Sequence, residues 1–283
     1  MIGKNLTIAI PASIVTNTPH LREKTAKIGL IGRAASIFRV DKIIIFPDKP
    51  KINQSKEIEF IITLLKYMNT PQYLRKKLFE IDAKLKFAGI LSPLRTPNHP
   101  TNSKSRNLRS GEYRDGIIIK KVKDGMLVEI GVEKLALLRE THWLMGDHVN
   151  SQIIKTGNQI EIQTVSKEEI PFYWGFSVYA EKKSLSNLIK NKNFDLIIGA
   201  SKKGIEFNSN LSEIVDKWKN ANNIIIEFGA PNRGLFEIAK DENMDLKKHT
   251  DFIVNTIPKQ GTETVRTEEA LIATLAIFNS FRN

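Results

Sequence analysis

The sequence of 283 residues contains no cysteine. Disulfide bonds, thiolate catalysis and cysteine-based zinc sites are therefore excluded. We also expect no bound metal, because none of the five histidines stands in a standard ligand spacing such as H-E-x-x-H. These histidines are His20, His99, His142, His148 and His249.

Long apolar runs are missing as well. No run approaches the roughly 18 residues that a membrane-spanning helix requires. The first residues, "MIGKNLTIAIPASIV", contain a short apolar stretch that Pro11 interrupts, and no small-residue cleavage site follows it. We therefore expect a cytoplasmic protein with no membrane partner.

Three common signatures of catalysis and nucleotide binding are absent from the sequence. It has no G-x-G-x-x-G fingerprint and no G-x-x-x-x-G-K-[ST] loop, and "GASKKG" is too short to be one. It also has no G-x-S-x-G elbow for a nucleophilic serine. Ordinary dinucleotide binding, phosphoryl transfer and triad hydrolysis are therefore poor fits.

Positive charge is in excess. The chain has 43 lysines and arginines against 31 acidic residues, a net charge of +12. Such an excess is typical of proteins that bind a polyanion, with nucleic acid as the first expectation and an anionic membrane surface as the second. A solubilising charge load is the alternative explanation.

The first ninety residues alternate between strand and helix patterns. We predict a strand over residues 6–15, a helix of about 20 residues that starts at Thr18 and Pro19, and a buried strand that stops at Pro47. Helices are predicted near 55–68 and over "TPQYLRKKLFEID".

The pattern changes near residue 90. "LSPLRTPNHPTNSKSRNLRSGEYRDG" has no periodicity and is typical of a long connection. Five short strand patterns then follow within about 50 residues, separated by turn signals. They predict a small all-β barrel of the OB kind, which we place at residues 92–165.

A βα alternation returns after the barrel. Apolar strands are predicted at 195–200, 224–228 and 251–257, with helices between them. Near-continuous apolar strands separated by helices indicate a parallel sheet covered on both faces. The sequence therefore predicts an α/β domain, residues 1–91 and 166–283, that is interrupted by the β insertion.

Each of the three C-terminal strands runs into a segment with glycine or proline. These segments are "IIGASKKG", "IIEFGAPNRGLFEIA" and "NTIPKQGTETVRTEEAL". Ligands of open parallel sheets bind at the carboxyl ends of the strands, and glycine lets a ligand approach the backbone. We predict that the three segments together hold one flat ligand, such as an adenine with its ribose.

Basic residues gather at the start of the β insertion. Eight lysines and arginines lie between Arg95 and Lys123, against two acids. OB folds bind single strands through a basic groove with stacking aromatics, although here Tyr113 is the one aromatic in this stretch and Trp143 lies further along. The candidate RNA-binding residues are Arg95, Lys104, Arg106, Arg109, Arg114, Lys120 and Lys121.

The C-terminal segments resemble a known family. "FGAPNRGL" and "IPKQGTETVRTEEAL" are similar to the cofactor loops of SPOUT (class IV) RNA methyltransferases, and "GLIGRAASIF" resembles the helix that carries their first-motif arginine. "TPQYLRKKLF", "SPLRTPNHP" and "GEYRDGIIIKK" resemble an archaeal and eukaryotic subgroup with an OB-like insertion, regarded as rRNA uridine-N3 methyltransferases. The resemblance implies a trefoil knot, S-adenosyl-L-methionine (SAM), an rRNA substrate and a homodimer with its active sites between the subunits.

The resemblance also implies roles for single residues. Arg33 matches an arginine that faces RNA or activates the acceptor, and Arg266 stands where ribose-methylating relatives carry asparagine, which favours a base target. Glu237 and Glu263 are possible bases. The residues that match cofactor-binding positions are Gly199, Ala200, Phe228, Gly229, Ala230, Gly234, Ile257, Pro258, Gly261, Thr264 and Val265.

Three alternatives stay open at this point. The chain could methylate a ribose 2′-oxygen, or it could be a catalytically silent RNA-binding or ribosome-assembly factor that keeps the fold. A protein methyltransferase is the third, against which the charge and the OB-like module argue.

Overall fold

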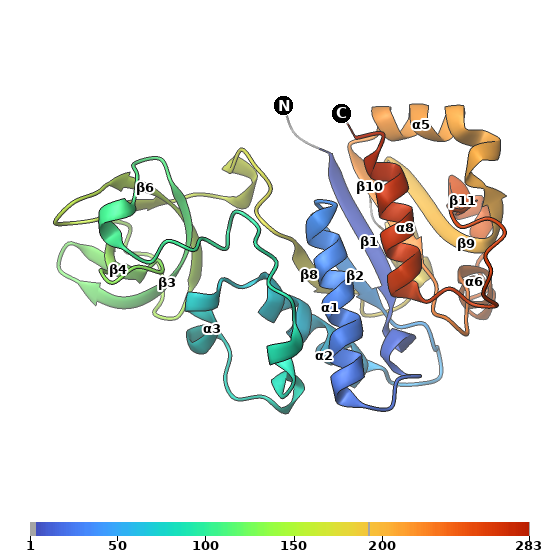
Figure 1. Cartoon of the computed structure of the whole chain (residues 1–283), viewed down its shortest axis with the longest axis horizontal. Coiled ribbons are helices and arrows are strands. Elements are labelled where there is room, and N and C mark those ends of the chain that lie inside the picture. Colours follow the sequence, from blue (N-terminus) through green and yellow to red (C-terminus); the bar gives the residue numbers. More distant parts are fainter. Residues whose placement is uncertain (1–3, 192, 283) are drawn as a thin grey trace. The chain divides into compact units, whose positions relative to one another are not determined.

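A computed structural model describes residues 4–191 and 193–282 of the chain (Figure 1). The chain forms two compact units. The first contains the chain up to Lys66, the segment Lys84–Ser92 and everything from Phe176 onward. The second contains Tyr67–Ala83 and Pro93–Gly175, so it adds a separate earlier segment to the expected insertion, 92–165, and extends beyond its end to Gly175.

The first unit is built on a six-stranded sheet in which every neighbouring pair is parallel. The strand order is β11-β9-β10-β1-β2-β8. The parallel sheet predicted from the sequence is confirmed, and β8 is a sixth strand that we did not predict. The strands are β1 (Asn5–Pro11), β2 (Lys42–Phe46), β8 (Ser177–Ala180), β9 (Leu196–Glu206), β10 (Asn223–Phe228) and β11 (Phe252–Asn255).

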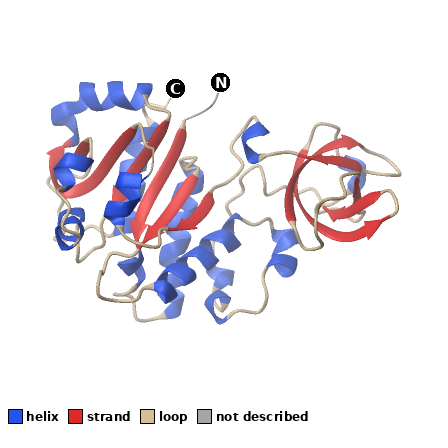
Figure 2. Ribbon diagram, turned by 180° about the vertical axis from the view of Figure 1, so that it is seen from behind, coloured by secondary structure: helices blue, strands red, loops and turns tan. Residues whose placement is uncertain are grey.

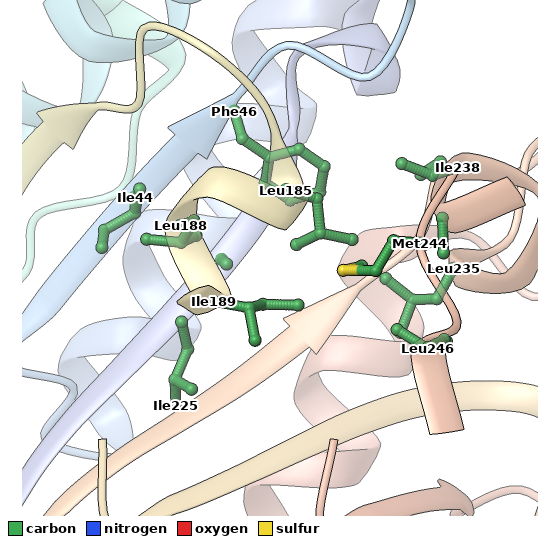
Figure 3. Close-up of a cluster of buried hydrophobic side chains, with 12 residues drawn as sticks. Ile44, Phe46, Leu185, Leu188, Ile189, Ile225, Leu235, Ile238, Met244 and Leu246 are labelled. Atoms are coloured by element: carbon green, nitrogen blue, oxygen red, sulfur yellow. The ribbon is translucent and has the colours of Figure 1, made fainter. Parts of the chain in front are cut away.

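Helices cover both faces of this sheet. Figure 1 shows α1 and α8 side by side in front of the strands. Figure 3 shows side chains of α4 packed on β2 and β10, in a cluster that α6 and α7 complete. The helices of the unit are α1 (Leu21–Ile37), α2 (Ser55–Asn69, whose last turn belongs to the second unit), α4 (Leu185–Asn191), α5 (Leu211–Asn220), α6 (Leu235–Asp241), α7 (Leu246–His249) and α8 (Thr267–Asn279).

Alternation along the strands explains why both faces are apolar. Ile44 and Ile225 belong to the cluster of Figure 3, whereas their neighbours Ile43 and Ile224 point to the opposite face and are fully buried. A sheet that buries both of its faces needs such continuous apolar strands.

The first strand is shorter than predicted. β1 ends at Pro11, and residues 12–15 form a short 3-10 helix. Asp48 holds this helix in place, because its carboxylate accepts hydrogen bonds from the backbone N–H of Ser13 (3.1 Å) and from the Ser13 hydroxyl (2.6 Å). The following helix begins at Leu21 and not at Pro19, since His20 occupies the N-cap.

The second unit contains a closed five-stranded barrel (Figure 2), as the sequence predicted. Its strand order is β3-β4-β5-β7-β6, with one parallel pair between β5 and β7. This Greek-key order is that of an OB-like barrel. The strands are β3 (Tyr113–Val122), β4 (Gly125–Glu129), β5 (Ala136–Leu138), β6 (His148–Lys155) and β7 (Glu161–Thr164). The helix α3 spans Gln72–Leu78, so it begins where expected but ends four residues before the predicted end.

One candidate RNA-binding residue is buried in the barrel unit. Arg114 has no exposed side-chain surface, and its guanidinium lies 2.6 Å from the Glu112 carboxylate and donates to the Asn102 carbonyl at 3.1 Å. The arginine therefore ties the lead-in segment to the first barrel strand, and its side chain is not available to a ligand at the surface.

Gly125 is required by the turn between β3 and β4. Its φ is 146°, and a Cβ at this position would lie 2.1 Å from the carbonyl oxygen of Leu138. Gly157 also has a positive φ, 109°, but a Cβ there would meet no other atom within 4 Å. We expect Gly125→Ala to lower the unfolding free energy by more than about 3 kcal/mol, and Gly157→Ala by only about 1 kcal/mol.

Urea denaturation followed by circular dichroism measures this difference. Because the two variants share the positive φ, the gap between them isolates the steric contact with the backbone of β5. Equal losses in the two variants would contradict the argument.

Candidate functional site

A pocket of about 340 Å³ lies beside the middle of β9 and at the carboxyl ends of β10 and β11. The three segments that the sequence singled out converge on it. Its lining consists of Ala200, Ser201, Lys202 and Lys203 from the first segment; Phe228, Gly229, Ala230, Pro231, Asn232, Gly234 and Glu237 from the second; and Asn255, Thr256, Ile257, Gln260, Glu263, Thr264, Val265, Thr267 and Ala270 from the third.

The first segment is part of a strand and not a loop. β9 continues to Glu206, and in its pairing with β11 the register jumps from Gly199 to Ile205. Residues 200–204 therefore form a bulge that turns toward the pocket. A Cβ on Gly204 would lie 2.5 Å from the carbonyl oxygen of Ile253, so only glycine permits this approach.

The second segment is a tight turn that opens α6. The backbone N–H of Ala230 donates to the carbonyl of Arg233 at 2.9 Å, and the reverse bond measures 3.2 Å. Directly before the turn, Gly229 has no room for a side chain, because a Cβ would lie 2.9 Å from Gly234 Cα and 3.0 Å from the backbone nitrogen of Leu235. The compactness of this turn leaves the backbone of Gly229 facing the pocket.

The third segment is tied to the other two by side chains. Lys202 donates to the carbonyl of Glu263 at 3.0 Å, and the hydroxyl of Thr267 donates to the carbonyl of Gly229 at 2.8 Å. Asn255 shapes the start of the segment, because its side-chain oxygen accepts from the backbone N–H of Ile257 at 3.0 Å. The pocket walls are therefore linked across all three segments.

One ion pair stands at the pocket edge. The ammonium group of Lys203 donates to the Glu237 carboxylate, and this hydrogen bond is the main cause that holds the pKa of Glu237 below its usual value. The Gly234 backbone, at the N-cap of α6, also contributes to lowering that pKa. Glu237 is therefore a carboxylate engaged by a cation, which makes it a weak proton acceptor.

Eight of the predicted cofactor residues line the pocket: Ala200, Phe228, Gly229, Ala230, Gly234, Ile257, Thr264 and Val265. Gly199, Pro258 and Gly261 do not. We did not predict the polar lining residues, which are Ser201, Lys202, Lys203, Asn232, Asn255, Thr256, Gln260 and Thr267. The one feature of the sequence that could have indicated these residues is their position next to the glycines and prolines of the three segments.

The two predicted catalytic arginines lie outside the pocket lining. Arg266 is exposed and occupies the N-cap of α8, where its backbone N–H donates to the Glu269 carboxylate at 2.9 Å. Arg33 is half-buried on α1, the helix that packs against α8. Both arginines therefore belong to the same packed helix pair, with Arg266 at the start of α8 and Arg33 on α1.

The basic candidates of the second unit differ in exposure. Six side chains are exposed, whereas Arg114 is buried as described above. The exposed residues are Arg95, Lys104, Arg106, Arg109, Lys120 and Lys121. They come from the lead-in segment and from the end of β3.

The described residues contain neither a membrane-spanning helix nor a metal-binding cluster. No helix in this part of the chain is both long and apolar enough to cross a membrane. Among the same residues, no group of three or more histidine, aspartate and glutamate side chains is arranged to hold a metal ion.

Comparison with known proteins identifies the family. The sequence profile of the family described as "Putative RNA methyltransferase" matches residues 5–278, nearly the whole chain. The chain belongs to this RNA methyltransferase family. Membership makes the protein an RNA methyltransferase, and it requires that a methyl donor and an RNA reach the same site.

Individual relatives of this RNA methyltransferase come from archaea and animals. A Halobacterium salinarum protein whose name states no activity is 31% identical, over 95% of this chain and 96% of its own length. The 28S rRNA (uridine-N(3))-methyltransferase of Homo sapiens is 29% identical, over 96% of this chain and 77% of its own. The enzyme of the same name from Drosophila melanogaster is also 29% identical, and the chain spans 61% of its length.

Proposed function

We propose that this RNA methyltransferase transfers a methyl group from SAM to N3 of a uridine in large-subunit rRNA. The observation that carries the proposal is the pocket in which three linked segments meet, one from the middle of β9 and two from the carboxyl ends of the parallel strands β10 and β11. The names of the human and Drosophila relatives supply the uridine and the rRNA.

The pocket residues fit SAM. A volume of about 340 Å³ is within the range of small-molecule pockets. Gly229 and Ala230 line the pocket with little side-chain volume, which suits a flat group that approaches the backbone closely. The lining also offers the hydroxyl of Thr264 and the side-chain oxygen of Gln260 for the ribose and amino-acid parts, whereas the amide of Asn255 is already bonded to the Ile257 N–H and the Lys202 carbonyl.

When bound, SAM supplies an electrophilic methyl group on its sulfonium. The residues of the chain must then position the uracil and compensate the charge that develops as N3 loses its proton. An arginine can do this by preorganised electrostatics, and Arg33 and Arg266 are our candidates. Glu263 on the pocket wall is the better candidate to accept the proton, because Glu237 is paired with Lys203.

We propose that the protein acts as a homodimer through α1 and α8. Leu30 and Ile37 are 51% and 56% exposed on α1, and Ile272 is 40% exposed on α8. Leu30, Arg33 and Ile37 follow helical spacing and share one face of α1. A second copy that covers this apolar face would bring Arg33 into the contact, which fits an active site formed between two subunits.

We further propose that the C-terminal segments form a trefoil knot. The sheet order supports this, because β11, the last strand, lies at the edge beside β9 while β10 lies on the other side of β9. The third segment then returns to the second through the bond between Thr267 and Gly229. The barrel unit would bind the RNA.

Ribose 2′-O methylation is the nearest competing chemistry, and a silent assembly factor is the competing role. Arg266 argues against the first, since relatives that methylate ribose carry asparagine there. The pocket argues against the second, because a protein that binds no ligand here has no need to keep three linked segments open around a volume of about 340 Å³.

A calorimetric titration with SAM, followed by methyl transfer to deproteinised rRNA, tests the function. We expect micromolar-range binding and, after nuclease digestion, 3-methyluridine by mass spectrometry. A 2′-O-methylated nucleoside would reject the base target. No SAM binding by the folded protein, with or without RNA, would reject the enzymatic proposal.

A further inference from the structure

Three aromatic rings meet on the outside of the barrel. Tyr113 begins β3, whereas Phe172 and Trp174 follow a short 3-10 helix (Lys167–Glu169) about sixty residues later. The ring centroids of Tyr113 and Phe172 are 5.6 Å apart at an interplanar angle of 87°, and those of Phe172 and Trp174 are 5.8 Å apart. These separations lie in the range where aromatic rings attract each other. We call Tyr113, Phe172 and Trp174 the aromatic platform.

The platform has a rigid base. Trp174 is only 5% exposed, and its indole N–H donates to the carboxylate of Asp115 at 2.9 Å and to the side-chain oxygen of Asn150 at 3.1 Å. Because Trp174 is fixed in this way, the rings that pack on it are held in one arrangement. A ligand would therefore bind them at little cost in side-chain entropy.

The outer part of the platform is open to solvent. Phe172 is 46% exposed, and Tyr113 is half-buried. A phenylalanine that is held rigidly but left half in water contributes little to folding for its size. Its exposed face is suited to receive a second flat ring.

Two glutamine side chains border the platform. Gln152 is the cross-strand partner of Tyr113, and Gln163 is the partner of Gln152 in the next strand. The amide nitrogen of Gln163 donates to the amide oxygen of Gln152 at 3.0 Å. Beyond this bond, the amide of Gln163 carries an acceptor oxygen and a second N–H, which match the polar edges of nucleobases.

Two arginines lie close to the aromatic platform along the sequence. Arg106 and Arg109 are exposed just before Tyr113. The hydroxyl of Ser110 and the N–H of Gly111 donate to carbonyls of β6, at 3.2 and 2.7 Å, and so hold Arg109 near the start of β3. A guanidinium at this place would attract the phosphates of a bound strand.

We propose that Phe172 stacks on an unpaired nucleobase of a single-stranded RNA segment, with Tyr113 against the side of this stack, Gln163 at the base edge and Arg109 at a phosphate. The surface lies on β3 and β6. OB folds bind nucleic acid through the face of their second and third strands, which are β4 and β5 here. These two strands carry no aromatic residue, and the proposed surface is a different one. The inference rests on the proposed RNA substrate and identifies which part of that substrate the barrel unit holds.

Fluorescence anisotropy with the full chain tests the proposal. The probes are a labelled unstructured RNA of about 12 nucleotides and a duplex of equal length. The variants are Phe172→Ala, Phe172→Trp, Arg109→Gln, and Leu144→Ala as a control that removes an apolar side chain, 71% exposed, from another barrel loop. Thermal unfolding checks that each variant is folded.

We expect Phe172→Ala to weaken single-strand binding roughly 10-fold, with an unchanged salt dependence, because a stacked base is lost and no phosphate contact is. Phe172→Trp should bind as the original does, and Leu144→Ala should be silent. Arg109→Gln should lower the slope of log affinity against log salt by about 0.7. A base analogue that fluoresces when unstacked should be quenched by the original protein and not by Phe172→Ala.

Several results would overturn the proposal. The first is an unchanged affinity of Phe172→Ala for the single strand, and the second is an equal loss of affinity in Leu144→Ala. The third is a preference of the original chain for the duplex. The fourth is no RNA binding at all, which would leave a protein contact as the use of this surface. SAM titration of the same variants separates this inference from the proposed function. Loss of stacking in Phe172→Ala with intact SAM binding supports both proposals, whereas an original chain that stacks RNA but binds no SAM rejects the enzymatic proposal alone.

Discussion

Gly229→Val removes SAM binding from the folded protein. The two branches of valine start from a Cβ that already lies 2.9 Å from Gly234 Cα and 3.1 Å from the carbonyl oxygen of Arg233. Both contacts are with backbone, so the turn that opens α6 must shift as a whole or the side chain must enter the pocket. Either response changes the wall that we propose for SAM, and we expect affinity to fall at least about 100-fold, or roughly 2.7 kcal/mol.

Two other glycines serve as controls for this variant. A Cβ on Gly89 or on Gly261 would meet no atom within 4 Å. Gly89 does not line the pocket, so Gly89→Ala should bind SAM as the original does. Gly261 lies on the third segment, and a loss of affinity in Gly261→Ala would report the ligand itself, since nothing in the chain is in the way.

Isothermal titration calorimetry with SAM and with S-adenosylhomocysteine measures these affinities. Circular dichroism shows whether Gly229→Val keeps its secondary structure. If the folded variant bound SAM as tightly as the original chain, the proposed cofactor site would be in the wrong place.

Local patterns were sufficient for most elements of the fold. β2 (Lys42–Phe46) is a run of apolar residues between a charged residue and a proline, and it forms the strand that this pattern predicts. The five barrel strands are separated by glycine-containing turns such as that at Gly125, which the sequence shows directly. These signals are local because each depends on a few neighbouring residues.

The bulge in β9 shows where local patterns stop. "GASKKG" contains two glycines and two lysines, and the apolar pattern predicts a strand that stops at residue 200, yet the strand continues to Glu206. The strand depends on the close approach of Gly204 to Ile253, some fifty residues later in the chain. A Cβ on Gly204 would lie only 2.5 Å from the carbonyl oxygen of Ile253. Strand pairing over such a separation leaves no pattern in the segment itself.

Side-chain burial limited the prediction of the functional residues. Arg114 was grouped with exposed basic residues because charge counts do not distinguish a buried arginine, although Glu112 two residues earlier was a possible partner. In the same way, Tyr113 looked isolated along the sequence. The rings of Phe172 and Trp174 reach it only through the folding of the second unit.

Glu227→Met should make the protein more stable at neutral pH. Glu227 lies in β10 directly before the Gly229 turn, has no exposed surface, and neither of its carboxylate oxygens has a hydrogen-bond partner among the described residues. It follows Ile225 on the same face of the strand, so it projects toward the apolar cluster of Figure 3. Its cross-strand neighbours, Ala9 and Gly199, are small and leave room for a methionine.

The pH dependence follows from the direction of the shift. Burial, with a smaller contribution from the Glu242 carboxylate, raises the pKa of Glu227 from 4.5 to about 8. Between these two values the unfolded chain has lost this proton and the folded chain keeps it, so stability falls by about 1.4 kcal/mol per pH unit as the pH rises. Relative to its value below pH 4.5, the unfolding free energy is therefore lowered by roughly 3 kcal/mol at pH 7 through the titration of Glu227. This loss stops growing above about pH 8.

Urea denaturation at pH values of about 5.5, 7 and 8.5 separates this effect from others. We expect Glu227→Met to gain little at the lowest pH and more at each higher one, because it removes both the titration and two buried oxygens without partners. Glu213→Gln, which neutralises an exposed carboxyl on α5 of the same unit, is the matched control and should follow the original chain at every pH. If Glu227→Met were less stable than the original at pH 8.5, the carboxylate would have to be stabilised by a cation, and the buried face beneath the Gly229 turn would be a polar site and not an apolar one.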